Sequence, residues 1–404
     1  MTDDQILNEL LGLPHVRAVS YRIVTATRIE VHIESSLDVA VCPHCQCVST
    51  QLHDTAEPQL LRDLPAWGRD CWLRYAPRRF ACARCHSTFV ERVAWREAGL
   101  AYTRRYAQYI YARTQHEDMA QVARAEGLSQ DTVRAIFEQG ANNMLAQRGY
   151  PVVKVLGLDE FTIHKGHGHY RLVISAPELG LVLDVLADRK KETLEAWFDQ
   201  RGKAWCAQVE VCCADMWDAY HTVAQDKLPN AQRVVDRFHV MENLNDAVTT
   251  ARRTIQKQAD EATQAILKGG RWLLVKNRDK LTAEEAAQLD LMLAASPALK
   301  TCYELKEDFR TWFAQLTDRE TAAKTLLAWQ EKAKATKLRS LQAFVRTLDN
   351  WRESILNYFN GPHSNGLAEG VNLKIKLLNR RGFGYRNFAH FRLHILVAFG
   401  PSSR

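Results

Sequence analysis

The sequence predicts a multidomain α/β protein, because the pattern of apolar residues changes character along its 404 residues. Residues 17–41 alternate between apolar and polar side chains, as strands with one solvated face do. Between residues 152 and 235, short apolar runs alternate with amphipathic segments, which predicts a mixed α/β sheet. Residues 240–351 are rich in Ala, Leu, Lys and Glu and predict helices alone, too long a stretch to be a simple connection.

Two Cys-x-x-Cys pairs follow the first strands, and they are Cys42 with Cys45 and Cys82 with Cys85. This spacing lets two thiolates of one tight turn reach a single Zn²⁺ ion at about 2.3 Å, and two such turns complete a four-sulfur site. The 36 residues between the pairs exceed the usual zinc-ribbon spacing, but they can form strands and loops. We therefore expect a strand-rich, zinc-ribbon-like module with a structural Zn²⁺ ion, which leaves no open position for catalysis.

The alternative for these four residues is a set of ordinary buried cysteines. His44 and Cys47 lie close enough in the sequence to be rival ligands. The remaining cysteines are expected to be small buried hydrophobic residues, namely Cys71, Cys206, Cys212, Cys213 and Cys302.

Residues 103–148 have helical periodicity, and residues 116–139 have the pattern of a helix-turn-helix. Gly127 suits the turn and Ser129 can cap the second helix. Such a second helix enters the DNA major groove by its N-terminal end. The residues that would then face DNA are Gln130, Asp131, Thr132 and Arg134. The alternative is a plain helical hairpin.

The positive charge is concentrated in two segments. Residues 62–113 contain eleven arginines and four acids, and residues 371–404 contain seven lysines and arginines and no acid. Each of these two segments therefore has a formal charge of +7. Because the net charge of the whole chain is +7 as well, the residues outside the two segments are slightly acidic on balance. Two concentrated basic segments indicate two surfaces that contact DNA, although solvated helix faces would give the same pattern. Arg78 and Arg79 belong to the first segment.

Two aspartates directly follow apolar runs of the predicted sheet. Asp159 follows residues 152–158 and Asp215 follows residues 209–214, so both are expected at the C-terminal ends of strands, where open α/β sheets place active sites. Glu369 lies on a predicted helix far along the chain. Three such carboxylates can hold two Mg²⁺ ions for phosphodiester chemistry.

The pattern alone leaves other acids open, because an aspartate at a strand end is commonly a turn or cap residue. Glu160, Asp218 and Asp236 are rivals at neighbouring positions, and Asp184, within a strand pattern, is a weaker one.

Several motifs together resemble the DDE transposases of the ISL3 insertion-sequence family over essentially the whole length. They are the two cysteine pairs with RRF before the second, GLDEFTIHKGHGHY from Gly157, DMWDAY from Asp215, VDRFHV from Val235 and SNGLAEGVNLKIKLLNRRGFGYRNFAHFR from Ser364. The last stretch is long and highly specific.

The resemblance implies a ribonuclease-H-like catalytic core interrupted by an all-helical insertion, preceded by a zinc domain and a helix-turn-helix. By position, Asp159, Asp215 and Glu369 match the catalytic triad of the family. The expected domains are residues 1–98 (zinc), 99–150 (helix-turn-helix), 151–239 (core, first part), 240–355 (helical insertion) and 356–404 (core, final part).

The basic residues after Glu369 are then expected to flank the catalytic centre and to hold DNA phosphates. They are Lys374, Lys376, Arg380, Arg381, Arg386 and Arg392. Asp236 and His239 match the VDRFHV motif, and His239 is expected either to contact the scissile phosphate or assist protons, or to have a structural role only.

The sequence therefore predicts a transposase that uses two Mg²⁺ (or Mn²⁺) ions and acts as a homodimer or higher homo-oligomer. Its partners would be terminal inverted repeats and target DNA. The start of the chain lacks the pattern of a signal peptide, and no apolar run is long enough to span a bilayer, so a cytoplasmic location and no membrane partner are expected. Two alternatives stay open: a zinc and helix-turn-helix regulator with an inactive core, and a metal-dependent nuclease that only hydrolyses DNA.

Overall fold

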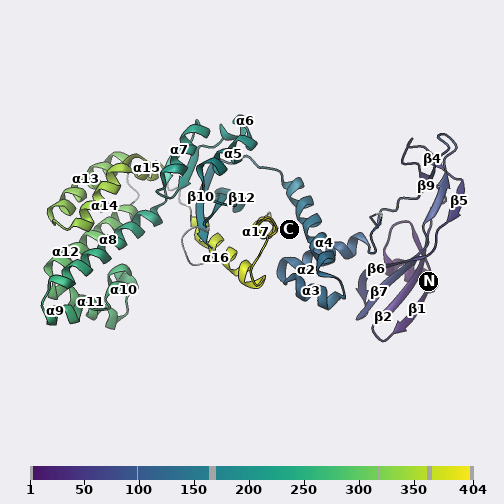
Figure 1. Cartoon of the computed structure of the whole chain (residues 1–404), viewed down its shortest axis with the longest axis horizontal. Helices are drawn as coiled ribbons and strands as arrows, with labels where there is room; N and C mark the ends of the chain where they lie inside the picture. Colours follow the sequence, from purple (N-terminus) through teal and green to yellow (C-terminus); the bar gives the residue numbers. More distant parts are fainter. Residues whose placement is uncertain (1–2, 98, 163–169, 316–317, 362–365, 401–404) are drawn as a thin grey trace. The chain divides into compact units, whose positions relative to one another are not determined.

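The computed structural model describes residues 3–97, 99–162, 170–315, 318–361 and 366–400 (Figure 1). The chain divides into two compact units, residues 1–146 and 147–404, which are described separately.

The first unit begins with the short helix α1 (Asp3–Leu11) and a four-stranded sheet in the order β1-β2-β7-β6. Its strands are β1 (Val16–Thr25), β2 (Arg28–Ser35), β7 (Arg69–Tyr75) and β6 (Gln59–Ala66). The predicted strands over residues 17–41 are confirmed as the antiparallel hairpin of β1 and β2. The buried residues Ile33, Leu61 and Leu73 lie in the core of this sheet.

Two smaller sheets carry the cysteine pairs. One pairs β3 (Ala40–Val41) with β4 (Val48–Ser49), and the other contains β5 (Leu52–Thr55), β8 (Arg78–Ala81) and β9 (Thr88–Val90). Each Cys-x-x-Cys segment is thus the turn of a short antiparallel hairpin.

Three helices complete the first unit, and they are α2 (Arg104–His116), α3 (Met119–Glu126) and α4 (Gln130–Arg148). The predicted turn is confirmed, since Gly127 ends α3 with a left-handed φ of 64° that a residue without a Cβ adopts readily. Ser129 caps α4, because its hydroxyl oxygen accepts a hydrogen bond from the N–H of Thr132 at 3.0 Å.

A buried carboxylate joins the sheet of the first unit to its helices. Asp63 on β6 is 1% exposed, and it accepts hydrogen bonds from the hydroxyl of Thr103 at 2.6 Å and from Nε of Arg105 at 2.8 Å. The N-cap of α2 and the start of that helix are therefore fixed to β6 by one acid.

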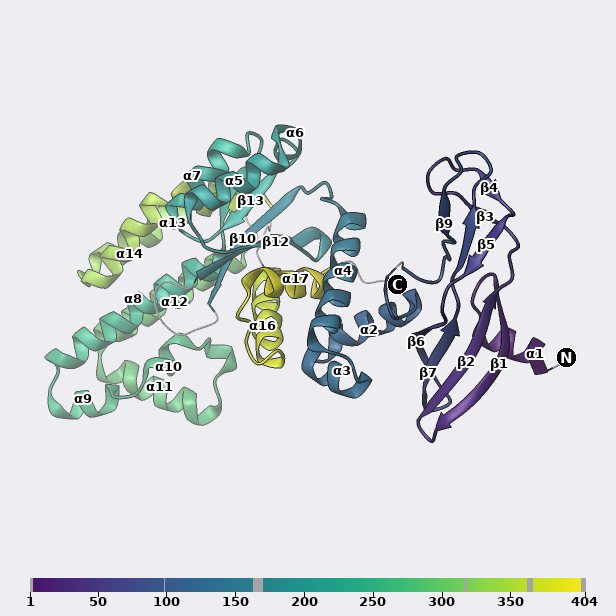
Figure 2. The same ribbon diagram turned by 45° about the vertical axis from the view of Figure 1, so that its right-hand side comes forward.

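The second unit contains a five-stranded sheet in the order β12-β11-β10-β13-β14, of which β10, β12 and β13 are labelled in Figure 2. Its strands are β10 (Val155–Thr162), β11 (Tyr170–Ala176), β12 (Leu181–Leu186), β13 (Val211–Ala214) and β14 (Gln232–Val235). The first three pair antiparallel, whereas β13 and β14 run parallel to β10. The mixed α/β sheet predicted from residues 152–235 is confirmed.

Helices cover both faces of this sheet. Cys212 and Ala214 of β13 pack with α5 (Lys191–Arg201) and α7 (Asp218–Lys227), while Val211 and Cys213 point to the helical segment that follows β14. The short helix α6 (Lys203–Cys206) and the 3₁₀ turn η1 (Pro177–Leu179) connect strands.

A helical segment follows the sheet, and its core is continuous with the face of β13 and β14 that points to it. It starts with the long helix α8 (Arg237–Gln258), whose apolar side packs against α10, α12 and α14. The other elements of the segment are α9 (Glu261–Leu267), α10 (Arg271–Val275), η2 (Arg278–Lys280), α11 (Ala283–Ala295), α12 (Pro297–Ala314), α13 (Arg319–Ala335), α14 (Arg339–Asn350), α15 (Arg352–Leu356) and η3 (Asn357–Asn360).

The chain then returns to the sheet with α16 (Gly366–Arg381), which contacts β10, and α17 (Phe388–Ala398), which packs on β12. Among the described residues, no helix is both long and apolar enough to cross a bilayer.

We predict that Asp63→Ala locally destabilises the first unit by about 3 kcal/mol, because it leaves the Arg105 guanidinium without its buried partner. Hydrogen exchange of the full chain would show this as faster exchange of the β6 and α2 amides. Asp54→Ala is the matched control, since its pair with Arg79 is exposed and contributes less than about 1 kcal/mol. Equal effects of the two substitutions would contradict the assignment.

Candidate functional site

The sheet brings Asp159 and Asp215 to neighbouring strands. Asp215 directly follows β13, as predicted, but Asp159 lies inside β10, and its predicted place at the end of that strand is wrong. The reason is a change of partner: the parallel pairing of β10 with β13 ends at Leu158, while the antiparallel pairing with β11 continues to Thr162. Asp159 is thus the first residue of β10 beyond the edge where β13 ends.

One imidazole lies between these two carboxylates. His239, in the first turn of α8, places Nε2 at 3.8 Å from Oδ1 of Asp159 and Nδ1 at 3.6 Å from Oδ1 of Asp215. Its Nδ1 is also 3.5 Å from a carboxylate oxygen of Glu242. Asp159 and Asp215 therefore face the same small volume, beside the end of β14 from which α8 starts.

Helix α16 reaches the same place through Asn372. The side-chain amide of Asn372 donates a hydrogen bond of 2.7 Å to Oδ2 of Asp159 and a longer one, 3.4 Å, to the backbone carbonyl of Glu160. Glu369 lies three residues earlier in α16, but its side chain is outside the described residues. The sequence reasoning missed Asn372, although its helical spacing from Glu369 could have indicated it.

The electrostatics of the site favour a cation. Burial lowers the pKa of His239, but the nearby carboxylates of Asp159 and Asp215 outweigh burial and raise this pKa to about 9. Burial also raises the pKa of Asp236, and a hydrogen bond from the N–H of Phe238 only partly opposes this. The carboxylates thus hold a proton on His239, as expected of an oxygen-rich donor set that also fits a hard divalent ion.

The rival acids have other partners or lie elsewhere. Glu160 accepts hydrogen bonds from the hydroxyl of Tyr220 at 2.6 Å and from Arg189 at 2.9 Å. Asp184 is held by Arg392 at 2.5 Å and by the indole N–H of Trp197.

Two further acids belong to helix starts. Asp236 caps α8 by accepting a hydrogen bond from the N–H of Phe238 at 3.1 Å, and Asp218 is an exposed residue in the first turn of α7. Asp159 and Asp215 therefore share the His239 imidazole with Glu242, which lies one turn further along α8.

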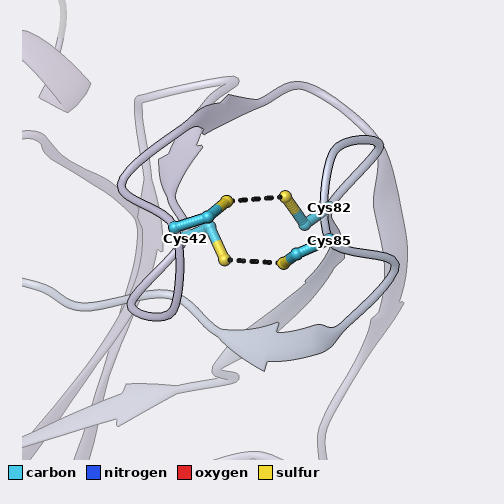
Figure 3. Close-up of side chains that lie close together, drawn as sticks. Cys42, Cys82 and Cys85 are labelled. Atoms are coloured by element: carbon cyan, nitrogen blue, oxygen red, sulfur yellow. Dashed lines mark hydrogen bonds between the residues drawn. The ribbon is translucent and has the colours of Figure 1, made fainter.

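The four predicted zinc ligands form one cluster in the first unit. The Sγ atoms of Cys42 and Cys85 are 3.6 Å apart, those of Cys45 and Cys82 are 3.5 Å apart, and all four lie within 4.8 Å of one another (Figure 3). A regular tetrahedron with Zn–S distances near 2.3 Å would place its sulfurs about 3.8 Å apart. The cluster therefore has the dimensions of a structural Zn²⁺ site and supports that assignment.

Protonation of the cluster also fits a cation site. Burial raises the pKa of Cys42, but backbone hydrogen bonds from Cys45 and His44 outweigh it and lower this pKa to about 6. For Cys45, a backbone hydrogen bond from Cys47 lowers the pKa, whereas burial and the sulfur of Cys82 raise it to about 12. The thiolate form is thus favoured at Cys42 and disfavoured at Cys45, and a cation shared by the four sulfurs would stabilise the thiolates together.

The rival ligands stay outside this cluster. Cys47 receives a contact from Arg84 at 3.2 Å, and His44 is exposed. The prediction that the other cysteines are buried is confirmed for Cys71, Cys206, Cys212, Cys213 and Cys302.

The predicted DNA-facing residues of the helix-turn-helix lie at the start of α4. Gln130, Asp131 and Arg134 are exposed, and Thr132 is half-buried. Arg134 is 3.1 Å from Asp131, a surface pair that a phosphate or base can replace at little cost.

Arg78 has a different place from the one expected. Its guanidinium donates to Glu91 and to the backbone carbonyl of Leu37, and its side chain is only 17% exposed, so it stabilises the zinc module rather than facing DNA. Arg79 is exposed and pairs with Asp54.

The basic residues of α16, α17 and the turn between them differ among themselves. Lys374 donates a hydrogen bond of 2.5 Å to the carbonyl of Ala398, and burial lowers its pKa. Arg392 is bound to Asp184. The remaining four have no carboxylate within 4.0 Å in the described part of the chain, and they are Lys376, Arg380, Arg381 and Arg386.

Comparison with known proteins now bears on this arrangement. A family model described as "Transposase" matches residues 156–395, which include the sheet, the helical segment, α16 and most of α17. The chain belongs to the ISL3 transposase family. Models for the "zinc-finger of transposase IS204/IS1001/IS1096/IS1165" and the "Helix-turn-helix domain of transposase family ISL3" match residues 38–85 and 95–141. The predicted order of zinc module, helix-turn-helix and transposase core is confirmed.

Individual relatives agree with the ISL3 assignment. The chain is 30% identical to the transposase for insertion sequence element IS1001 of Bordetella parapertussis over 93% of both chains. It is 27% identical to the transposase for insertion sequence element IS1557 of Mycobacterium tuberculosis over 57% of both chains.

We predict that the purified ISL3-family chain contains about one Zn²⁺ ion, and that Cys82→Ser removes it because three sulfurs cannot complete the tetrahedron. Metal analysis by mass spectrometry measures this content. Cys47→Ser is the matched control in the same module and should retain the ion. A metal content that Cys47→Ser lowers and Cys82→Ser leaves unchanged would overturn the ligand set.

Proposed function

We propose that this chain is the transposase of a bacterial insertion sequence, and that Asp159, Asp215 and Glu369 hold two divalent metal ions at its active site. The observation that carries this proposal is the position of His239 between Asp159 and Asp215. Glu369 lies three residues before Asn372 in α16, and positions three apart share one side of a helix. Asn372 donates to Asp159, and this contact of α16 supports the inclusion of Glu369 in the proposed site.

We infer that the sheet is a ribonuclease-H-like core. Its support is the strand order, in which three consecutive antiparallel strands are followed by two strands parallel to the first. The helices α8 to α15 lie between the fifth strand and α16, so they form the insertion in this proposal. Domains over residues 151–239, 240–355 and 356–404 follow from it, after a zinc domain over 1–98 and a helix-turn-helix domain over 99–150.

The chemistry follows from the donor set. Two Mg²⁺ or Mn²⁺ ions would supply the charge that activates a water or a DNA 3′-hydroxyl and that stabilises the leaving oxygen. Asp159 is oriented for this role by Asn372, which holds one carboxylate oxygen. His239 is an accessory residue that can donate a hydrogen bond to the scissile phosphate. Asp236 has a structural role, because it caps α8, the helix that carries His239. No side chain needs to attack DNA covalently.

DNA recognition is divided between the units in this proposal. The start of α4, with Gln130, Thr132 and Arg134, reads the terminal inverted repeats in the major groove. Lys376, Arg380, Arg381 and Arg386 bind phosphates near the cleaved bond. Transposition joins two ends to a target, so the active form is a homodimer or higher homo-oligomer, and its DNA substrate places it in the bacterial cytoplasm.

Two other functions give different products. A zinc and helix-turn-helix regulator with an inactive core would bind the ends of the element without nicking them in Mg²⁺. A nuclease that only hydrolyses DNA would cut the ends without joining them to a target. The experiment that separates all three is incubation of the chain with end DNA and target DNA, followed by detection of nicked and joined strands.

We predict that Asp159→Asn, Asp215→Asn and Glu369→Gln each lower end cleavage by at least about 1,000-fold, because each removes a charge that holds the ions. Binding to the same end DNA should change by less than about threefold. Asp218→Asn is the matched control, since it removes the same charge three residues from Asp215 and should leave cleavage unchanged. Wild-type cleavage by any one of the three variants would exclude that residue as a ligand.

We predict that Arg134→Ala weakens binding to end DNA by about 10-fold, because a base contact of an arginine contributes roughly 1–3 kcal/mol to discrimination. Binding to unrelated DNA should weaken much less, and fluorescence anisotropy with both duplexes at fixed salt measures the difference. Lys300→Ala, which removes an exposed cation from α12, is the control for charge alone. An equal loss on both duplexes would show that Arg134 contacts only phosphates.

A further inference from the structure

The turn between α16 and α17 presents an aromatic side chain to solvent. Phe383 is 90% exposed, more than any other large hydrophobic residue among those described as exposed. Its φ of 52° lies in the left-handed region, which a residue with a bulky side chain rarely adopts. Packing against the described residues of this chain therefore gives the Phe383 ring little stabilisation to offset its disfavoured backbone conformation.

Backbone hydrogen bonds and a ring contact fix the conformation of the turn that carries Phe383. The N–H of Phe383 donates to the carbonyl of Arg380 at 3.1 Å, and that of Gly384 donates to the carbonyl of Asn379 at 2.9 Å. The ring of Tyr385 stacks on Phe391 of α17 at 4.6 Å.

Gly382 allows this packing. A Cβ at position 382 would lie 2.6 Å from a ring carbon of Tyr385, which is closer than real contacts permit. The glycine thus lets the turn close on Tyr385 while Phe383 projects outward.

The surroundings of Phe383 identify the class of partner. Residues 371–400 contain six lysines and arginines and no acid. Lys376, Arg380, Arg381 and Arg386 have no carboxylate within 4.0 Å in the part of the chain that the structure describes. A partner that offers both negative charge and a flat apolar face satisfies the cations and the ring together, and a nucleotide whose base has left the helical stack offers both.

We propose that Phe383 stacks on an unpaired base of the transposon end, close to the phosphate that is cleaved. This proposal rests on the proposed function, because the position of the cleaved phosphate is taken from the triad. From Asn372 to the end of α16 the helix rises by about 14 Å. That length corresponds to about four base pairs of duplex. The stacked base should therefore lie within roughly six base pairs of the cleaved phosphate.

The role of the ring is to stabilise an opened base pair. Extrusion of a base costs a few kcal/mol of stacking and pairing, and an aromatic side chain that takes the place of the lost neighbour offsets part of this cost. Lys376, Arg380, Arg381 and Arg386 would meanwhile bind the phosphates on either side of the displaced nucleotide.

The test uses the full chain carrying Asp215→Asn, without Mg²⁺, and duplexes taken from the DNA that flanks the reading frame. 2-Aminopurine replaces one base at a time near the cleavage position, since its fluorescence changes when it leaves the stack. We expect a change at one position that Phe383→Ala abolishes and that the conservative Phe383→Tyr retains. Leu377→Ala, which truncates another exposed residue of α16, should leave the change in place.

A second measurement links the ring to the reaction in the chain with its native Asp215. Phe383→Ala should lower cleavage of the paired end by about 10-fold, and a mismatch at the responding position should restore it, because the base is then already open. The fluorescence arm needs no cleavage, so it reports on Phe383 even if the triad is wrong. The proposal is overturned if no position responds, if Phe383→Ala keeps the response, or if Phe383→Ala changes sedimentation of the DNA-free chain, which would place the ring in a protein interface.

Discussion

Repulsion between neighbouring carboxylates is the constraint on which the rest of this structure depends. Asp159 and Asp215 approach one point from two strands, and like charges so close are stable only with a positive group between them. His239 supplies that group, which is why its pKa is raised to about 9 in spite of burial. In the zinc module, backbone hydrogen bonds lower the pKa of Cys42, whereas burial and the sulfur of Cys82 raise that of Cys45.

The fold brings these charged groups together, because distant parts of the chain meet at one edge of the sheet. The change of partner along β10 leaves Asp159 without a strand partner on the β13 side at the level where β13 ends, and the start of α8 brings His239 to the same level. The helical segment contains an aromatic cluster around Phe309. This segment separates two parts of the site in the sequence. In the fold, α16 nevertheless returns to β10, where Asn372 donates a hydrogen bond to Asp159.

The sequence predicted the elements whose pattern is local. The strands of the sheet, the turn at Gly127, the cap at Ser129 and the cysteine pairs all follow from short-range spacing and composition. It could not predict pairings between distant residues. The extension of β10 past Asp159 depends on hydrogen bonds with β11, and the burial of Arg78 depends on Glu91. For the same reason, the sequence could not predict that Glu160 pairs with Arg189 and Tyr220.

The most direct measurement of the central claim is the anomalous scattering of manganese in crystals of the chain grown with Mn²⁺. The account predicts two manganese peaks about 3.5–4 Å apart, with carboxylate oxygens of Asp159, Asp215 and Glu369 as their ligands. It also predicts that His239 no longer lies between the two aspartates. Absence of manganese at this edge of the sheet, or a Glu369 carboxylate turned away from bound ions, would contradict the account.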